Sequence, residues 1–229
     1  MEFIFKYERI TQFLLSVVGV IVGVDIITKI IRFSYNIQDN YGYWSLLDID
    51  VENSFGNFYS SVALLLVSII FLLVAYNKKL NLGLANYWYG LAFIFCLFAF
   101  DEAIDIHEVI SKHVEFGFLI HGPQGEAWLV PYLAFLVVFV LFYSRFLLKI
   151  PSSVRNGLIF ATIIYMTGVA GFEVFTEWYE KIYGHGLVHA LLTTVEDTFE
   201  MLGIILLIKT LLHHIEHEIG VLSLNFHKV

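Results

Sequence analysis

The chain has 229 residues and a formal net charge of −8; 59% of its residues are hydrophobic and 15% are charged. Soluble proteins average roughly 45–50% apolar and about 25% charged residues, so this composition argues against a soluble globular domain. Nucleic-acid binding is also disfavoured, because 13 Lys and Arg against 21 Asp and Glu leave no basic surface for phosphates. The composition instead predicts an all-α membrane protein.

Six apolar segments follow one another along the chain, each close to the roughly 20 residues that a helix needs to cross a bilayer core of about 30 Å. The segments cover residues 10–31, 56–76, 84–106, 127–148, 155–178 and 187–211. The first segment lacks a small-residue cleavage site, which predicts a retained span rather than a signal peptide. We therefore predict one integral membrane domain over residues 1–229, a polytopic bundle of about six transmembrane helices.

Positive and negative residues fall at opposite ends of the predicted helices. Most Lys and Arg residues belong to one end: Lys6, Arg9, Lys78, Lys79, Arg145, Lys149, Arg155, Lys209 and Lys228. The loops of the other end are acidic and contain Asp39, Asp48, Asp50, Glu52, Glu115, Glu126 and Glu180. The positive-inside rule then predicts that both termini are cytoplasmic. Because the chain also lacks an N-x-S/T glycosylation site, we expect a bacterial inner membrane, with membrane lipid as a partner.

Three of the apolar segments carry polar side chains at helical spacing. These are Asp101, Asp105 and Glu108 in the third, Glu173, Glu177 and Glu180 in the fifth, and His189, Thr193, Glu196 and Glu200 in the sixth. Each acidic residue in the middle of a membrane helix costs about 2.5–3.5 kcal/mol on insertion, more than several apolar neighbours offset. The three stripes are therefore expected to meet in one pocket in the outer half of the bilayer.

A metal ion is the simplest way to neutralise so many carboxylates, since few basic residues lie near them. Carboxylate and imidazole ligands are typical of zinc, iron or manganese sites. We predict that the ligands come from Asp101, Asp105, His107, Glu108, Glu173, Glu177, His189, Glu196 and Glu200. Ferritin-like di-iron bundles use Glu-x-x-His pairs, which this chain lacks. The alternative is that protonated or water-linked polar residues only tie the helices together.

Two of these segments also carry a recognisable motif. Asp101, Glu102, His107 and Glu108 form a D-E-x4-H-E pattern, and Glu196 and Asp197 precede an E-x2-G pattern that ends at Gly203. This combination resembles that of uncharacterised bacterial multi-pass membrane proteins with a D-E-x4-H-E helix. The resemblance implies that these acidic residues belong to one site, and it implies no particular activity.

The predicted function is that of a metal-dependent membrane enzyme, a hydrolase or an oxidase, that acts on a lipid or another amphipathic substrate. Glu102 or Glu200 is the expected general base if it does not ligate the metal. A cation or proton transporter is the first alternative, because the same carboxylates can bind and release ions. A non-catalytic membrane subunit is the second.

Two further patterns concern packing. Asp25 and Lys29 stand four residues apart in the first segment, which predicts an ion pair inside the bundle. Small residues in the fifth segment predict close contacts between helices rather than a ligand channel: Ala161, Gly168, Ala170 and Gly171.

Overall fold

The computed structural model of the protein describes residues 7–37, 42–76, 82–104, 106 and 129–219, and this part of the chain contains helices and no strand. The elements are α1 (Tyr7–Ser34), α2 (Tyr43–Leu47), α3 (Phe55–Ala75), α4 (Leu82–Ile104), α6 (Leu129–Leu147), α7 (Ser152–Met166), the π-helical turns η2 (Thr167–Phe172), α8 (Glu173–Tyr183), α9 (Leu187–His214) and the π-helical end η3 (Ile215–Ile219). The predicted all-α fold is therefore confirmed for the described residues.

Helices occupy the described part of each of the six predicted segments, with α7, η2 and α8 forming the fifth. Four helical segments are long and apolar enough to cross a membrane: Tyr7–Ser34, Phe55–Ala75, Gly83–Ile104 and Ser152–Tyr183. The apolar part of α6, Ala134–Leu147, is shorter, and α9 is not among the four. Composition thus supports a membrane location, while the number of crossings stays a prediction.

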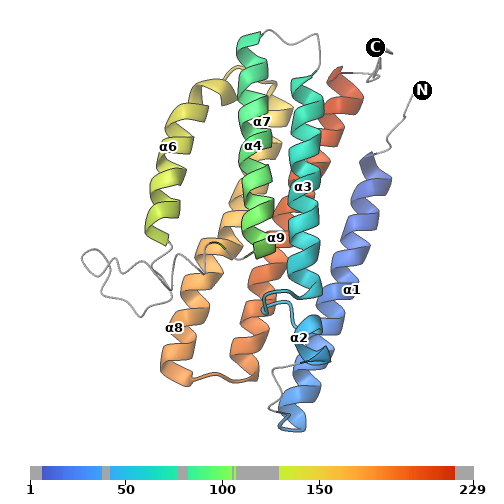
Figure 1. The fold of residues 1–229 in the computed structure, drawn as a ribbon, viewed down its shortest axis with the longest axis vertical. Helices are drawn as coiled ribbons and strands as arrows, with labels where there is room; N and C mark the ends of the chain where they lie inside the picture. Colours follow the sequence, from blue (N-terminus) through green and yellow to red (C-terminus); the bar gives the residue numbers. More distant parts are fainter. Residues whose placement is uncertain (1–6, 38–41, 77–81, 105, 107–128, 220–229) are drawn as a thin grey trace.

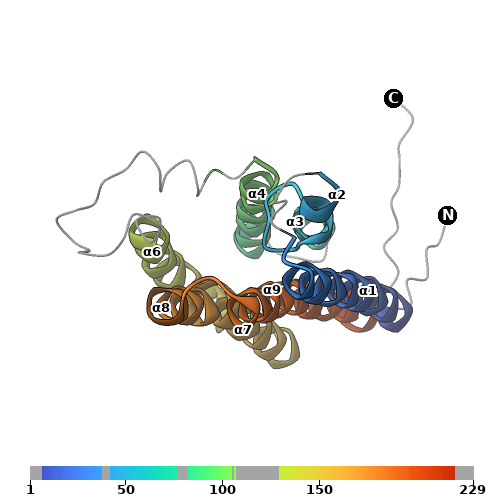
Figure 2. The same cartoon turned by 90° about the horizontal axis from the view of Figure 1, so that it is seen from below.

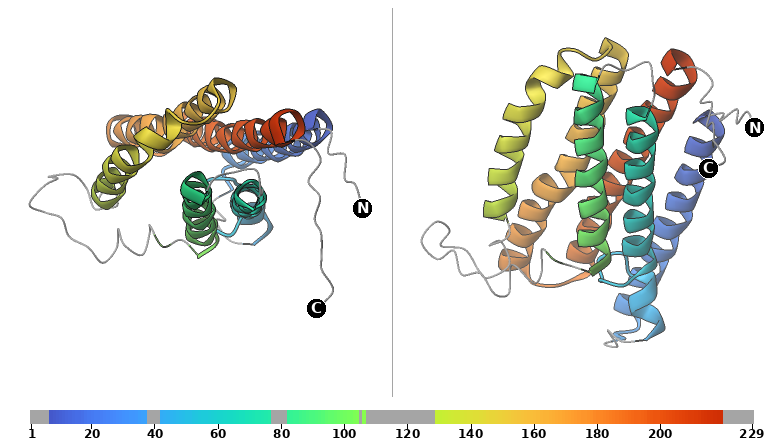
Figure 3. Two further views of the ribbon diagram at one scale, coloured as in Figure 1. Left: turned by 90° about the horizontal axis from the view of Figure 1, so that it is seen from above. Right: turned by 45° about the horizontal axis from the view of Figure 1, so that its top comes forward.

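The described helices form two layers, and α9 lies in the middle of one of them. Viewed along the helix axes, α1, α9 and the α7–α8 segment lie in one layer, and α3 and α4 form the second (Figure 2; Figure 3, left). α9 contacts α1, α3, α7, η2 and α8, whereas α6 stands at the edge beside α4. The helix that carries Glu196, Asp197 and Glu200 is therefore the central one, with neighbouring helices on several sides.

The two ends of the bundle differ in character (Figure 1). At one end, the beginning of α1 meets the end of the chain's last helical segment, where the backbone N–H of Tyr7 donates to Oε2 of Glu216 at 3.3 Å. α2, the α8–α9 turn and the last residues of α4 lie at the opposite end. We call these the termini end and the loop end. A closely packed apolar core fills the termini half, with these side chains at 1% exposure or less: Val67, Phe71, Val74, Trp88, Phe146, Ile205, Ile208 and Leu211.

Many large apolar side chains point away from the bundle. Exposed fractions above 60% occur on α1, α3, α4 and α6, at Phe13, Val20, Phe58, Phe93, Ile104, Val138, Leu141 and Phe142. Apolar surface of this extent marks contact with a membrane or another protein. The exposed apolar surface is compatible with a membrane location, as is the length of the four apolar helical segments.

Two glycines bring α9 close to the segment formed by α7 and η2. A Cβ atom added to Gly203 would lie 2.8 Å from Cα of Tyr165, and one added to Gly168 would lie 2.8 Å from the backbone oxygen of Glu196. The predicted close contact at Gly168 is therefore confirmed. Because Gly168 belongs to the π-helical turns, this irregular segment packs directly on the acidic part of α9. Such π-helical insertions occur frequently at functional sites.

Candidate functional site

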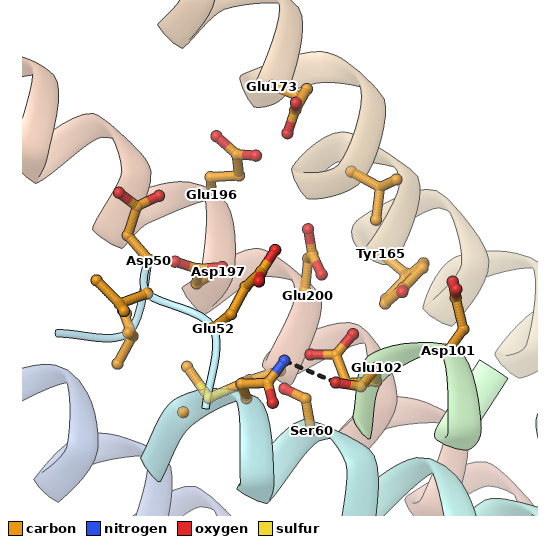
Figure 4. Close-up of a pocket in the computed structure, with 16 residues that line it drawn as sticks. Asp50, Glu52, Ser60, Asp101, Glu102, Tyr165, Glu173, Glu196, Asp197 and Glu200 are labelled. Carbon is orange, nitrogen blue, oxygen red and sulfur yellow. Dashed lines mark hydrogen bonds between the residues drawn. The ribbon is translucent and has the colours of Figure 1, made fainter. Parts of the chain in front are cut away.

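A cavity of about 240 Å³ lies near the loop end, between the α2–α3 loop, the last turn of α4, the η2–α8 junction and α9 (Figure 4). Eight of its lining residues are acidic: Asp50, Glu52, Asp101, Glu102, Glu173, Glu196, Asp197 and Glu200. None of the described residues that line it is Lys, Arg or His. Figure 4 shows these carboxyl groups converging from four separate parts of the chain. We call this the acidic cavity.

The contact between Glu196 and Glu173 joins α9 to α8. The hydroxyl of Thr176 donates to Oε2 of Glu196 at 3.0 Å, and Glu173 lines the cavity beside it. Two ionised carboxylates only accept hydrogen bonds, so two such groups side by side repel each other. The pair therefore places two acidic groups next to each other at the junction of α8 and α9.

The α2–α3 loop carries Asp50 and Glu52 to the cavity because both of its ends are fixed. Asp48 at the start of the loop binds Lys29 at 3.1 Å and Arg32 at 2.8 Å. At the other end, Ser54 caps α3 by accepting from the backbone N–H of residue 57 at 3.2 Å. The loop is thus pinned on both sides of its acidic residues.

α3 also holds the acidic end of α4. The side-chain amide of Asn57 donates to the backbone oxygen of Glu102 at 2.8 Å, and Ser61 donates to the backbone oxygen of Ala99 at 2.9 Å. These bonds place the last turn of α4, with Asp101 and Glu102, at the side of the cavity that faces α9.

Asp50 lies outside the helices, and its charged form is disfavoured. Surrounding protein removes water from its carboxyl group and raises the pKa of Asp50 above its usual value, although Lys29 attracts the negative charge. Nearby Asp48 raises this pKa further, while His189 and His185 lower it. The side chain keeps contact with solvent through the cavity.

A second buried polar region lies between α1 and α9, and its acidic side chains form ion pairs with basic side chains of the same chain. Asp25 and Lys29 are 3.3 Å apart with side chains 0% and 2% exposed, which confirms the predicted internal ion pair. Lys29 also binds Asp48, and Thr194 donates to Oδ2 of Asp25 at 2.6 Å. The backbone N–H of Ile49 donates to Oδ1 of Asp25 at 3.0 Å. We call this region the Lys29 network.

The structure brings four of the predicted ligands together in the acidic cavity, namely Asp101, Glu173, Glu196 and Glu200. It places two others elsewhere. Glu177 lies one turn beyond Glu173 and binds Lys181 at 3.3 Å. His189 precedes Glu196 by seven residues, about 10 Å along the helix, and contacts Glu180 instead. Asp105, His107 and Glu108 lie outside the described residues.

Sequence patterns did not predict that Asp50 and Glu52 line the cavity. Both lie in a loop, and without a helical period the direction of a side chain cannot be predicted. Two others, Glu102 and Asp197, lie off the predicted stripes but belong to the D-E and E-D motifs. The motif resemblance therefore identified these two where periodicity did not. The only sequence feature that could have indicated a role for this loop is its high content of acidic residues.

A second cavity, of about 320 Å³, lies beside the acidic one between α3, α4, α6, α7 and α9. Its lining is almost entirely apolar, with Phe95, Phe98 and Phe139 among its walls. Tyr165 and Val169 line both cavities, so the two are neighbours. We call this second space the apolar cavity. Ala161 and Ala170, which were expected only to support helix contacts, line it as well.

Residues 13–215 match the family of the domain of unknown function DUF8692. The chain belongs to the DUF8692 family. No curated protein and no solved structure matches the chain. The DUF8692 match extends from α1 to the beginning of η3, so it includes every described residue of the acidic cavity, the apolar cavity and the Lys29 network.

Proposed function

We propose that this protein is an integral membrane enzyme that uses a metal ion in the acidic cavity to transform a lipid or another amphipathic molecule. One observation carries the proposal: a cavity lined by carboxylates adjoins an apolar cavity, and Tyr165 and Val169 line both. An amphipathic molecule has the same two parts. Its apolar part fits the second cavity while its polar group reaches the carboxylates.

The donor chemistry of the acidic cavity favours a cation. Glu173, Glu196 and Glu200 supply only oxygen atoms, which suits hard ions such as manganese or magnesium better than zinc. The volume of about 240 Å³ leaves room for water molecules beside an ion, and these ions commonly keep part of their hydration shell. When bound, such an ion lowers the pKa of a coordinated water and stabilises negative charge on a substrate oxygen.

The protein itself would orient the reacting group and regulate access of water. Thr176 holds the Glu196 carboxyl by donating a hydrogen bond to Oε2. A carboxylate of the cavity that does not bind the ion is positioned to accept a proton from water, the role expected of a general base. Glu200, beside Glu196 on α9, is our candidate for this role.

Access to the site supports an enzyme over a transporter. α6 packs against α4 at the edge of the bundle, so the apolar cavity lies where a lipid chain can enter sideways. Towards the termini end, Phe71, Trp88 and Ile208 belong to a closely packed core. This core blocks a path for ions through the bundle. We further propose six membrane crossings, with both termini cytoplasmic and the acidic cavity in the outer half of the membrane.

The test is a search for metal-dependent lipid chemistry. Purified protein is stripped of metal with chelator, reconstituted in vesicles of phosphatidylethanolamine and phosphatidylglycerol, and supplied with Mn²⁺ in air. Lipids are then analysed by mass spectrometry. We expect a new lipid product that depends on Mn²⁺ and is lost in Glu196→Gln, whereas exposed Glu8→Gln at the termini end retains it. A product that persists in Glu196→Gln, or no product in the wild type, would contradict the proposal.

A matched pair on α6 tests the role of the apolar cavity. Val140 lines this cavity, whereas Val138 on the same helix does not, and both are more than half exposed. Val140→Trp should fill part of the cavity and reduce turnover, while Val138→Trp should leave it unchanged. Equal activity in the two variants would exclude the apolar cavity as the binding place of the lipid chain.

A further inference from the structure

Three metal-ligating side chains meet where α8 turns into α9. Glu180, His185 and His189 each offer one donor atom, and these atoms lie within 4.8 Å of one another. Nδ1 of His185 is 3.6 Å from Oε1 of Glu180, and Nε2 of His189 is 3.5 Å from Oε2. Among the described residues, this is the group of three or more His, Cys, Asp or Glu side chains whose donor atoms lie close enough to hold one metal ion. It lies apart from the acidic cavity, whose lining contains none of the three.

The sequence of the turn explains why these side chains meet. Gly184 has a φ of +78°, which ends α8 with a backbone conformation that few other residues adopt. Gly186 then precedes α9 in an extended conformation. The chain reverses within these residues, so the last turn of α8 faces the first turn of α9. His185 sits in the turn itself, between the two helices.

The three side chains differ in exposure in a way that suits an ion taken up from solution. Glu180 and His185 are exposed, with side-chain fractions of 47% and 62%, while His189 is buried at 7%. The Nδ1 atom of His189 is buried without a hydrogen-bond partner among the described residues. The two carboxyl oxygens of Glu180 are each directed at one of the histidines.

We infer that Glu180, His185 and His189 bind a transition-metal ion of the zinc class. In a tetrahedral zinc site, ligand atoms about 2.0–2.2 Å from the metal lie roughly 3.3 Å from one another. The separations of 3.5 and 3.6 Å, which run to the two different carboxyl oxygens of Glu180, are close to this value. With one donor atom from each residue, all three lie within 4.8 Å of one another, so the side chains draw closer together when an ion binds. Two imidazoles and one carboxylate are the ligands of a three-coordinate protein site whose fourth position takes water or another ligand. His189 thus ligates a metal in a different site from the one expected from its sequence.

This triad is chemically distinct from the acidic cavity but electrostatically close to it. Imidazole ligands favour borderline ions such as Zn²⁺, whereas the cavity offers carboxylates alone. Asp50 of the cavity already responds to charge on His185 and His189. A divalent ion on the triad therefore favours the ionised form of Asp50. The triad does not depend on the enzymatic role proposed for the cavity.

The test measures zinc binding by the full-length protein in detergent after removal of metal by chelator. Zn²⁺ is titrated in competition with a chromophoric chelator, and Co²⁺ absorption reports the ligand geometry. We expect one equivalent of tightly bound Zn²⁺ in the wild type. His185→Ala, His189→Ala and Glu180→Gln should each weaken binding by at least about tenfold, since each removes a ligand.

Two controls separate this inference from other outcomes. His213 and His217 lie in ring contact at the termini end without a third ligand in the described residues, so His217→Ala should leave affinity unchanged. Glu196→Gln should also leave zinc affinity unchanged, even if it abolishes chemistry in the acidic cavity. Because buried His189→Ala carries a risk of misfolding, exposed His185→Ala decides the result, with folding checked by circular dichroism. Unchanged affinity in folded His185→Ala, or loss in His217→Ala, would overturn the inference.

Discussion

The Lys29 network and the acidic cavity both contain several carboxyl groups between helices near the loop end. Only the Lys29 network also contains basic side chains among the described residues. In the network, Asp25 and Asp48 share Lys29, and Arg32 binds Asp48 from the other side. In the cavity, the described lining residues include eight acidic side chains and no basic one. The two regions therefore differ in whether basic side chains stand among their acidic ones.

Removal of one charged side chain should change the stability of the protein in opposite directions in the two regions. Loss of a cation from the network leaves buried carboxylates without their counter-ion. Loss of one carboxylate from the cavity relieves repulsion among the others. The variants below test this difference, beginning with the one of largest expected effect.

Lys29→Met should destabilise the protein by about 3–5 kcal/mol, because it leaves Asp25 charged and fully buried without its partner. The free energy of unfolding is measured by titration with SDS in mixed micelles. Lys181→Met is the control, since its pair with Glu177 is partly exposed and should contribute about 1 kcal/mol or less. Equal effects of the two substitutions would show that the Lys29 network is not a stabilising unit.

Glu196→Gln should act in the opposite direction in chelator, since it removes one of the eight acidic groups that repel one another in the cavity and its amide can donate a hydrogen bond to a neighbouring carboxylate. The same variant should lose stabilisation by added Mn²⁺. In the wild type this stabilisation is about 2.7 kcal/mol when the ion concentration is 100 times its Kd. Thermal unfolding with and without Mn²⁺ measures both effects. A Glu196→Gln protein that is still stabilised fully by Mn²⁺ would rule out the cavity as the ion site.

Gly168→Ala should cost about 1–3 kcal/mol and weaken Mn²⁺ binding, because the new methyl group would lie 2.7 Å from Cγ of Glu200 and push η2 away from α9. Gly171→Ala in the same π-helical segment is the matched control. Its methyl group would have a nearest neighbour at 3.8 Å, within ordinary contact distance. If both alanine variants behave alike in SDS titration, close packing at Gly168 does not position the acidic residues.

Asp50→Asn should have the smallest effect and a defined dependence on pH. Because the folded state raises the pKa of Asp50, the carboxyl begins to oppose folding as pH rises through its unfolded-state pKa of about 4, and it does so fully above the raised value. The variant should be more stable than the wild type near neutral pH, with the difference disappearing below about pH 3, where Asp is protonated in both states. Melting curves in chelator, with Glu8→Gln as the exposed control, measure it. A constant difference at every pH would refute the assigned cause.

The helices and half of the acidic site follow from the sequence for one physical reason. Side chains three or four residues apart share a helix face, so Asp101, Glu173, Glu196 and Glu200 were expected to converge, and they line one cavity. The internal pair of Asp25 and Lys29 followed from the same rule.

The remaining features depend on contacts that a helical period does not encode. The position of Asp50 follows from ion pairs of Asp48 with α1, which are distant in sequence. His189 shares a face with Glu196, yet the length of α9 separates them and the α8–α9 turn gives the histidine other neighbours. The π-helical turns and the apolar cavity arise from packing among five helices.

The most direct test locates manganese by anomalous X-ray diffraction from crystals of the metal-stripped protein soaked in Mn²⁺. The account predicts an anomalous peak inside the acidic cavity, within coordination distance of Glu196 and Glu173. It also predicts no such peak in crystals of Glu196→Gln. A cavity without manganese in the wild type, while the ion occupies other sites in the same crystal, would contradict the central claim.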